Sequence, residues 1–334
     1  MNAPRGRLHP AVADVRRMVR RGLDDLSPDQ TVLVACSGGP DSTALALGAA
    51  FESRHAGWRV VAVVVDHGLQ PGSDRVATQV AQLLRGRGLA PVDVVAVAVD
   101  QRGEGLEAAA RRARYAALDE AAHRRHADVV LLGHTLDDQA ETVLLGLARG
   151  SGARSLAGMA ERSARYRRPL LSLTRDTTRA ACAAEGAPVW EDPHNHDDRF
   201  ARVRVRHDVL PVLESALGPG CAQALARTAR LLRDDADALD ALAAEAEREC
   251  RRVDGDGLDV SALVVLPPAL RRRVLRSAAL AAGSPATALF AVHVDALDEL
   301  VTRWHGQQGI DLPGGVCARR CGGTLRLAPS AVRG

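Results

Sequence analysis

The chain of 334 residues carries 46% hydrophobic and 25% charged residues, which excludes a disordered or collagen-like protein and allows about two domains. All 44 basic residues are Arg, so enzymes that need a Lys for a Schiff base or a Walker A loop are excluded. The net charge of +3 does not by itself identify a polyanionic partner, and an aromatic content of 2% argues against a protein that stacks many bases on aromatic side chains.

The first half of the chain alternates short apolar runs with Ala- and Arg-rich segments. Nearly continuous apolar runs are typical of parallel strands that are buried on both faces, and the segments between them favour helices. Strands are predicted at 31–36, 58–66, 92–100 and 127–133, and helices at 42–53, 73–87, 105–126 and 137–149. This order predicts an α/β fold with a doubly wound, Rossmann-like parallel sheet.

The second half is predicted to contain a connector helix and a smaller α+β domain. A short helix is expected near 174–185, and Pro211 with the Gly-Pro-Gly of 218–220 marks the end of the first domain. We predict a first domain over 1–216, a connector helix over 217–252, and a small domain over 253–334 with helices at 270–283 and 291–304 and a hairpin within 309–327.

The strongest motif is Ser-Gly-Gly-Pro-Asp-Ser, which lies between the first predicted strand and the helix that follows it. Two glycines let the backbone close around an anion, and the free amides at a helix N-terminus supply hydrogen-bond donors. The predicted phosphate-binding residues are Ser37, Gly38, Gly39, Pro40, Asp41 and Ser42. The alternative is an ordinary glycine-rich turn with Ser42 as the helix N-cap, which the full hexapeptide disfavours.

Polar residues also follow the second and fourth predicted strands, at the edge of the sheet where α/β folds bind ligands. Asp66 and His67 end the second strand, and a capping turn is the alternative role for them. Two adjacent acids, Asp137 and Asp138, follow the fourth strand and suit a magnesium ion that bridges phosphate oxygens. We predict Asp137 as a metal ligand together with Asp41 of the loop.

The same two acids have a structural alternative. One of them could be the N-cap of the next helix, with Glu141 as its capping-box partner. His134 is predicted either to position a substrate or to assist proton movement, and a satisfied buried histidine is the alternative.

Arg111 and Arg114 lie three residues apart on one predicted helix and therefore share a face. Arg111 is predicted as the clamp on a reacting α-phosphate, because a fixed cation stabilises phosphoryl transfer electrostatically. A solvated, charged helix face is the alternative.

The loop resembles the pyrophosphate-binding loop, or PP-loop, of the adenine-nucleotide α-hydrolase superfamily. Further motifs follow it in the order and spacing of one family in that group, and with the loop they resemble the tRNA(Ile)-lysidine synthase family. They are DHGLQ at 66–70, EAAARRARY at 107–115, GHTLDDQAET at 133–142, RGSG with LAGM at 149–159, RPLL at 168–171 and EDPHNHDDRFAR at 191–202. The family pattern has an Asn where Val203 stands here.

The resemblance implies an ATP-dependent ligase that uses Mg²⁺. The oxygen on carbon 2 of the wobble cytidine in a tRNA(Ile) with a CAU anticodon is adenylated, and L-lysine then joins that carbon while AMP leaves. Asp66, His67 and Gly133 are expected to bind the ATP, and the small domain to bind tRNA. The residues expected to contact tRNA are Asn195, Arg199, Arg202 and Arg206, for which exposed Arg residues along a β-strand are the alternative.

Three other functions remain as alternatives: a tRNA thiolase of the same superfamily, an amide-forming synthetase that uses ammonia, and a non-catalytic ATP-binding regulator. The thiolase would need a persulfide-carrying or cluster-binding cysteine, and the six cysteines contain no Cys-x-x-Cys pair. We expect reduced thiols and a cytoplasmic protein without membrane contact, and a homodimer is compatible with the sequence.

Overall fold

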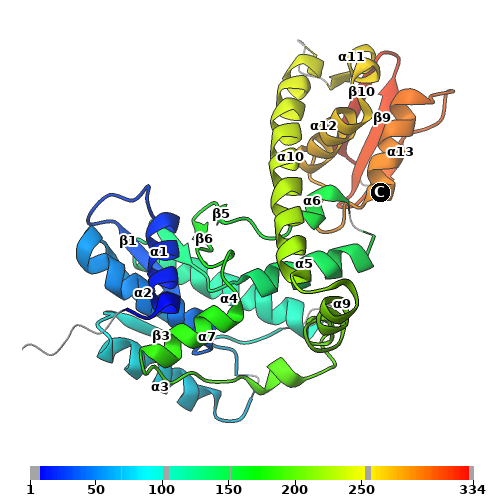
Figure 1. Cartoon of the computed structure of the whole chain (residues 1–334). Coiled ribbons are helices and arrows are strands. Elements are labelled where there is room, and N and C mark those ends of the chain that lie inside the picture. Colours follow the sequence, from blue (N-terminus) through cyan, green and yellow to red (C-terminus); the bar gives the residue numbers. More distant parts are fainter. Residues whose placement is uncertain (1–7, 69, 101–104, 151, 253–256, 331–334) are drawn as a thin grey trace, which may run out of the picture. The chain divides into compact units, whose positions relative to one another are not determined.

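The computed structural model describes residues 8–68, 70–100, 105–150, 152–252 and 257–330, and it divides into two compact units between Arg233 and Asp234. The division falls inside helix α10 (Cys221–Cys250), within the segment predicted as a connector. None of the described helices is long and apolar enough to cross a membrane. Figure 1 shows the helices and strands of both units.

A six-stranded sheet in the order β3-β2-β1-β4-β6-β5 forms the centre of the first unit. Its strands are β1 (Thr31–Ala35), β2 (Arg59–Asp66), β3 (Val92–Ala96), β4 (Val129–Leu131), β5 (Arg162–Ser163) and β6 (Tyr166–Arg167). All neighbours pair in parallel except β5, which is antiparallel to β6. The predicted doubly wound α/β fold is confirmed.

Helices cover both faces of this sheet because alternate residues of each strand point to opposite sides. Val32 and Val34 of β1 pack with α1, α2, α3 and α7, whereas Leu33 packs on the other side with α4. The helices of this unit before α10 are α1 (Pro10–Gly22), α2 (Pro40–Ala56), α3 (Ser73–Gly86), α4 (Leu106–Arg124), α5 (Leu136–Ala148), α6 (Ala153–Leu156), α7 (Arg175–Ala184), η1 (Pro193–His196), α8 (Ala201–Arg204), η2 (Val205–Val209) and α9 (Leu210–Leu217).

Two predicted strands are longer than the observed ones. The run predicted at 92–100 ends as a strand at Ala96. β3 pairs only with β2, and Ala96 lies opposite Asp66, the last residue of β2, so no partner strand continues beyond it. The run predicted at 127–133 pairs with β1 only over β4. Hydrophobicity continues past both ends, but strand pairing does not.

The second unit packs helices on one face of an antiparallel sheet in the order β7-β10-β9-β8. Its elements after α10 are β7 (Leu258–Asp259), α11 (Val260–Val265), α12 (Pro268–Ala281), α13 (Ala291–Thr302), β8 (Ile310–Leu312), β9 (Val316–Cys321) and β10 (Thr324–Pro329). The core includes Leu275 of α12, Leu297 of α13 and Leu325 of β10. The predicted small α+β fold is confirmed, with two further strands beside the expected hairpin.

Candidate functional site

The loop after β1 closes through serine contacts. Ser42 Oγ lies 3.1 Å from the Ser37 amide, from Ser37 Oγ and from the Gly39 carbonyl oxygen. Gly39 is the N-cap of α2 and Ser42 is the third helical residue, so the alternative role of Ser42 as N-cap is wrong. Pro40 suits the first helical position, and the first amides of a helix have no acceptor within it.

Gly38 is required by the geometry of this loop. It has a φ of +86°, and a Cβ there would lie 2.4 Å from Cγ2 of Val80 on α3. The loop can therefore lie tightly between α2 and α3, with its amides at the carboxyl edge of the sheet. That arrangement is typical of a phosphate site.

Gly133 brings the end of β4 against this loop. A Cβ on Gly133 would lie 2.8 Å from both the amide nitrogen and Cα of Ser42. Only a residue without a side chain allows this approach, which places the segment from His134 to Asp138 beside the first turn of α2.

Asp41 extends from α2 toward α7. Thr178 donates a hydrogen bond to Asp41 Oδ1, and Arg175 Nε lies 3.6 Å from Oδ2. Burial raises the pKa of Asp41 to about 6, an effect that the nearby Asp138 carboxylate increases and the Thr178 hydrogen bond opposes. The carboxyl group therefore titrates close to neutrality, and an added cation would favour its charged form.

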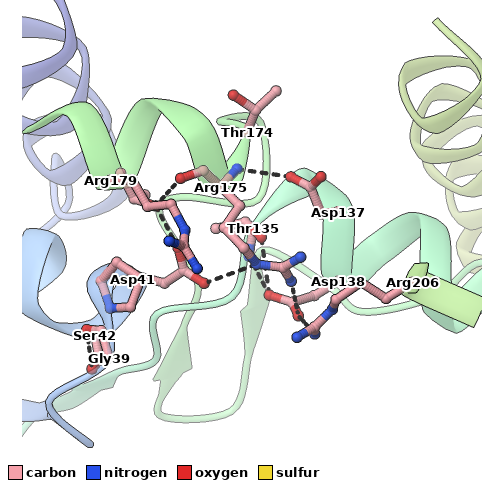
Figure 2. Close-up of polar contacts among 12 residues, drawn as sticks. Gly39, Asp41, Ser42, Thr135, Asp137, Asp138, Thr174, Arg175, Arg179 and Arg206 are labelled. Atoms are coloured by element: carbon pink, nitrogen blue, oxygen red, sulfur yellow. Dashed lines mark hydrogen bonds and ion pairs between the residues drawn. The ribbon is translucent and has the colours of Figure 1, made fainter. Parts of the chain in front are cut away.

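Arg175 lies at the centre of a group of carboxylates, as Figure 2 shows. Its amide donates to Asp137 Oδ2 at 2.8 Å, and its Nη2 donates to Asp138 Oδ1 at 3.1 Å and to Glu141 Oε1 at 3.4 Å. Burial acts to raise the pKa of Asp138, but Arg175 and other neighbours outweigh it and hold that pKa below its usual value. We call Asp41, Asp137, Asp138 and Glu141 the acidic cluster.

The start of α5 corrects one sequence-based alternative. Thr135 is the N-cap, and Asp138 Oδ2 accepts hydrogen bonds from the Thr135 amide at 2.8 Å and from its hydroxyl at 3.0 Å. An N-cap at Asp137 or Asp138 with Glu141 as partner is therefore wrong. Asp138 both caps α5 and faces Arg175, while Glu141 is fully buried in the cluster.

The basic segment after Phe200 is helical, so the alternative of a β-strand is wrong. α8 passes through the π-turn η2 into α9. Pro211 has no amide to donate to the carbonyl of His207, four residues earlier, which accounts for the irregular turn. The segment therefore presents its Arg residues with helical spacing.

Two of the Arg residues expected to contact tRNA lie on the acidic cluster. Arg206 donates to both Glu141 carboxylate oxygens, at 2.8 and 3.3 Å, and Arg202 Nη1 lies 3.7 Å from Glu141 Oε2. Asn195 and Arg199 are exposed, and Arg199 pairs with Asp197 at 2.6 Å. The four residues thus form two groups.

The end of β2 meets the loop through the segment at 190–192. Gln70 Nε2 donates to Asp192 Oδ1 at 2.6 Å, and the amide of Trp190 donates to the Gly38 carbonyl at 2.9 Å. Asp66 Oδ1 accepts the amide of Gly68 at 2.9 Å. Asp66 therefore does form the capping turn considered from the sequence, at the position expected for a nucleotide contact.

Among the described residues of this unit, nine buried side-chain nitrogens have no hydrogen-bond partner. Five of them belong to residues that lie close enough to act on one another electrostatically: His67 Nδ1, Arg114 Nε, His134 Nδ1, Arg168 Nε and Arg202 Nε. An unpaired buried polar atom costs about 1–3 kcal/mol of stability, so a group of them at one place indicates a missing ligand.

The two histidines of this group have lowered pKa values. Burial, and then the charge of Arg114, lower the pKa of His67. Burial lowers the pKa of His134 to about 3, and Arg114 adds to the shift.

Arg111 and Arg114 differ in their surroundings. Arg111 is exposed, with its guanidinium 4.9 Å from the ring centre of Tyr115 and Nη2 3.4 Å from the Tyr115 hydroxyl. Arg114 is turned inward, close enough to His67 and His134 to affect both. Of the two, Arg114 has the position of an inner anion contact.

The metal site predicted at Asp41 and Asp137 stays a prediction. In the described part of the chain, no three His, Cys, Asp or Glu side chains form a group that could hold a metal ion. Asp41 and Asp137 both contact Arg175, and Asp137 acts to raise the pKa of Asp41. Two neighbouring carboxylates fit Mg²⁺, which usually takes one or two carboxylates and completes its shell with phosphate oxygens and water.

Sequence reasoning missed Arg175 and Thr178 and gave Glu141 only a capping role. One signal was available for Arg175, which occupies the first helical position of α7 after the N-cap Thr174. A cation is unfavourable at a helix N-terminus, so it indicates a carboxylate partner elsewhere in the fold. Thr178 has no comparable signal.

Two family models match the chain. A PP-loop domain matches residues 12–213, and a TilS substrate binding domain matches residues 258–326.

The chain is also similar to curated and solved proteins. It is 55% identical to the tRNA(Ile)-lysidine synthase of Streptomyces coelicolor, over 95% of this chain and 98% of that protein, and 57% identical to that of Thermobifida fusca, over 95% and 97%. Among solved structures, a U34-tRNA thiolase from Methanococcus maripaludis with its [4Fe-4S] cluster matches 67% of this chain and 79% of that one, with a TM-score of 0.55 and 19% identity. At that identity, the structural likeness shows the fold alone.

Proposed function

The chain belongs to the tRNA(Ile)-lysidine synthase family of ATP-dependent PP-loop ligases, and we propose that its first unit adenylates the wobble cytidine of a CAU-anticodon tRNA(Ile) and joins it to L-lysine. The cytidine oxygen on carbon 2 attacks the α-phosphorus of ATP, and pyrophosphate leaves. The lysine ε-amine then attacks carbon 2, and AMP leaves.

The observation that carries this proposal is the approach of Gly133 to Ser42. This approach brings the predicted phosphate-binding loop at 37–42, the acidic cluster and the unpartnered nitrogen of His134 together at one edge of the sheet. A nucleotide bound by the loop amides would have its phosphates beside Asp41. Open α/β sheets bind ligands at this edge.

We assign the nucleotide contacts from this arrangement. The amides and hydroxyls of residues 37–42 bind the pyrophosphate portion, and Asp66, His67 and Gly133 line the adenosine portion. Asp41 and Asp137 would hold Mg²⁺, which offsets phosphate charge when it is bound. A cation there would also favour the ionised form of Asp41, whose pKa burial raises to about 6.

His134 is proposed to position the cytidine. Burial lowers its pKa to about 3, so the imidazole is neutral at neutral pH and is a weak proton acceptor. Its buried Nδ1 has no partner and can hydrogen-bond a polar atom of the base. Of the two predicted roles, the surroundings favour positioning over proton transfer.

Arg114 and Arg111 are proposed as inner and outer contacts of the α-phosphate. We expect Arg114→Gln to lower the kcat of AMP formation by about 10²–10³-fold, because it removes a preorganised cation from a buried site. Arg111→Gln should lower it by about tenfold, because its charge is screened by water. Steady-state assays of both variants measure the difference.

Arg124→Gln is the matched control, since Arg124 is exposed on the same helix and pairs only weakly with Glu120 at 3.2 Å. Its activity should equal that of the unmodified protein. A larger loss in Arg111→Gln than in Arg114→Gln would reverse the assignment.

For tRNA, we propose that Asn195 and Arg199 are the exposed contacts and that Arg202 and Arg206 act at the active site. The latter pair shares Glu141 with Arg175, so replacing either would remove one of the three arginines that neutralise this buried carboxylate. The two groups therefore need separate tests.

The thiolase alternative lacks a suitable sulfur near the loop. The cysteines in the described residues are free, and both Cys36 and Cys182 are buried. Burial raises the pKa of both thiols, that of Cys182 to about 12, so neither forms a thiolate easily.

The proposal is tested with labelled ATP, unmodified CAU tRNA and either L-lysine, ammonia or no amine. We expect pyrophosphate release to require tRNA, and AMP release to require lysine as well. AMP release with ammonia alone would favour an amide-forming synthetase, and ATP binding without any turnover would favour a regulator.

A further inference from the structure

Arg168 is a buried cation without an acidic partner. Two arginines of the described residues are buried, Arg168 and Arg271, each 7% exposed. Arg271 of the second unit donates to both carboxylate oxygens of Asp298, at 2.6 and 3.4 Å. Arg168 donates instead to the Ala160 carbonyl at 2.9 Å and to the Tyr115 hydroxyl at 3.4 Å, and no carboxylate of the described residues pairs with it. A buried charge is costly unless it is paired, so this position indicates an anion that the chain itself does not supply.

The unused edge of the Arg168 guanidinium has the geometry that binds a carboxylate. Its Nε is buried and has no hydrogen-bond partner, while Nη1 is held by the Ala160 carbonyl. In Arg20, Arg206 and Arg271, Nε and Nη2 donate together to the two oxygens of one carboxylate. Such bidentate, charge-assisted pairs are among the strong hydrogen bonds in proteins. A carboxylate is therefore the anion that the Nε side of Arg168 fits.

The order of the strands places Arg168 away from the phosphate-binding loop. Arg168 directly follows β6, and β6 pairs in parallel with β4, which leads to His134. On its other side β4 pairs with β1, which leads to the loop at 37–42. The carboxyl ends of these strands meet at one edge of the sheet, so the order along that edge is loop, His134, Arg168.

The electrostatics agree with this order. Burial lowers the pKa of His134, and the charges of Arg114 and Arg168 add to that shift. The charges that act on His67, at the end of β2, include Arg114. Arg114 therefore lies between the nucleotide side and His134, whereas Arg168 lies close to His134 on the side of β6.

Two small anionic groups take part in the proposed reaction at His134, and the strand order separates them. The α-phosphate belongs to the nucleotide, which the loop and Arg114 hold on the side of β1. The other is the α-carboxylate of lysine, whose ε-amine attacks carbon 2 of the cytidine. A backbone phosphate of tRNA fits less well, because Arg168 is buried and a small molecule reaches such a position more easily than a polymer backbone does.

We propose that Arg168 binds the α-carboxylate of the lysine substrate and thereby selects an amino acid over other amines. The inference rests on the proposed function, which supplies the amine and the atom that it attacks. A carboxylate held by Arg168 would also restrict the position of the ε-amine at the other end of the same molecule, beside the base. The role of Arg168 is thus to set specificity for the second substrate.

The test compares L-lysine with L-lysinamide, in which an uncharged amide replaces the carboxylate. With ATP and CAU tRNA, AMP release by the full-length protein should have a kcat/KM about 10–100-fold higher for lysine, because lysinamide loses a charge-assisted pair. Arg168→Gln should raise the KM for lysine by about the same factor and remove the preference for lysine. Its tRNA-dependent pyrophosphate release without lysine should be unchanged.

Arg165→Gln is the matched control, because it removes an exposed arginine between β5 and β6, three residues from Arg168. Its KM for lysine should equal that of the unmodified protein. Arg168→Lys keeps the charge without the planar fork, so it should lose only part of the preference for lysine. Circular dichroism shows which variants are folded, and Arg168→Lys replaces Arg168→Gln in the comparison if the latter does not fold.

Equal kcat/KM values of the unmodified protein for lysine and lysinamide would overturn this assignment while leaving the proposed function in place. So would an unchanged KM for lysine in folded Arg168→Gln, or an equal increase in Arg165→Gln. Slower pyrophosphate release with a normal KM for lysine would also overturn it, and would place Arg168 at the α-phosphate instead. If no amine supports AMP release by the unmodified protein, the proposed function itself is overturned.

Discussion

Asp41→Asn is expected to lower the rate of ATP-dependent tRNA modification by about a thousandfold or more while the protein stays folded. Asn keeps the acceptor for the Thr178 hydroxyl but loses the charge that we assign to the metal and phosphates. Pyrophosphate release and circular dichroism measure the two effects. Asp176→Asn is the matched control, because it makes the same change at an exposed position of α7, and it should retain full activity.

The same variant has an expected pH signature in stability. The folded-state pKa of Asp41 is raised to about 6 from an ordinary value of 3.8, so its protonated form is favoured in the fold. The protonated carboxyl therefore adds up to about 3 kcal/mol to the free energy of unfolding. This stabilisation is fully present below about pH 4 and is lost as pH rises through 6. Asp41→Asn should therefore gain free energy of unfolding relative to the unmodified protein between pH 4 and 7. Parallel pH profiles, or normal turnover in the folded variant, would contradict the role of Asp41.

Arg175→Gln is expected to reduce the free energy of unfolding by about 3–5 kcal/mol at pH 7. The substitution leaves Asp41, Asp138 and Glu141 close together without their common counter-charge. In the fold, the pKa of Asp138 lies below its usual value. The ionised carboxylate therefore stabilises the fold at neutral pH, and this stabilisation is lost as pH falls through the folded-state pKa. The deficit of the variant should therefore persist down to about pH 4 and shrink below it, because the usual pKa of this carboxyl is 3.8. Urea unfolding at several pH values measures it.

Two further variants of α7 make this test specific. Arg175→Lys keeps the charge but not the geometry of the guanidinium, so it should lose an intermediate amount of stability. Arg179→Gln removes an exposed arginine that pairs with Glu191 at 2.7 Å, and it should change stability by less than about 1 kcal/mol. Equal effects of Arg175→Gln and Arg179→Gln would contradict the central position of Arg175.

The loop and the sheet were predictable from the sequence because their signals are local. Continuous apolar runs identified the buried strands, and the hexapeptide at 37–42 combines turn glycines with a helix start. Strand ends were less accurate, because β3 stops where its neighbour β2 stops and not where hydrophobicity ends.

The acidic cluster was only partly predictable because it depends on contacts between distant segments. Arg175 is more than thirty residues from Asp138, and nothing near either residue specifies the other. Arg202 and Arg206 looked like an exposed basic edge, yet the π-turn helix directs both toward Glu141. Charge spacing identifies the residues on one face of an element but not the element that this face meets.

The central claim is that the wobble cytidine is converted to lysidine, and base discrimination at that position tests it most directly. Cytosine and uracil share the oxygen on carbon 2, so a specific site must recognise the exocyclic amine and ring nitrogen of cytosine, whose absence would leave buried partners unmatched. The measurement is mass spectrometry of nucleosides from CAU and UAU versions of tRNA(Ile) after incubation with the protein, ATP and L-lysine. Lysidine in the CAU tRNA with none in the UAU tRNA is the expected result, and equal modification of both, or of neither, would contradict the account.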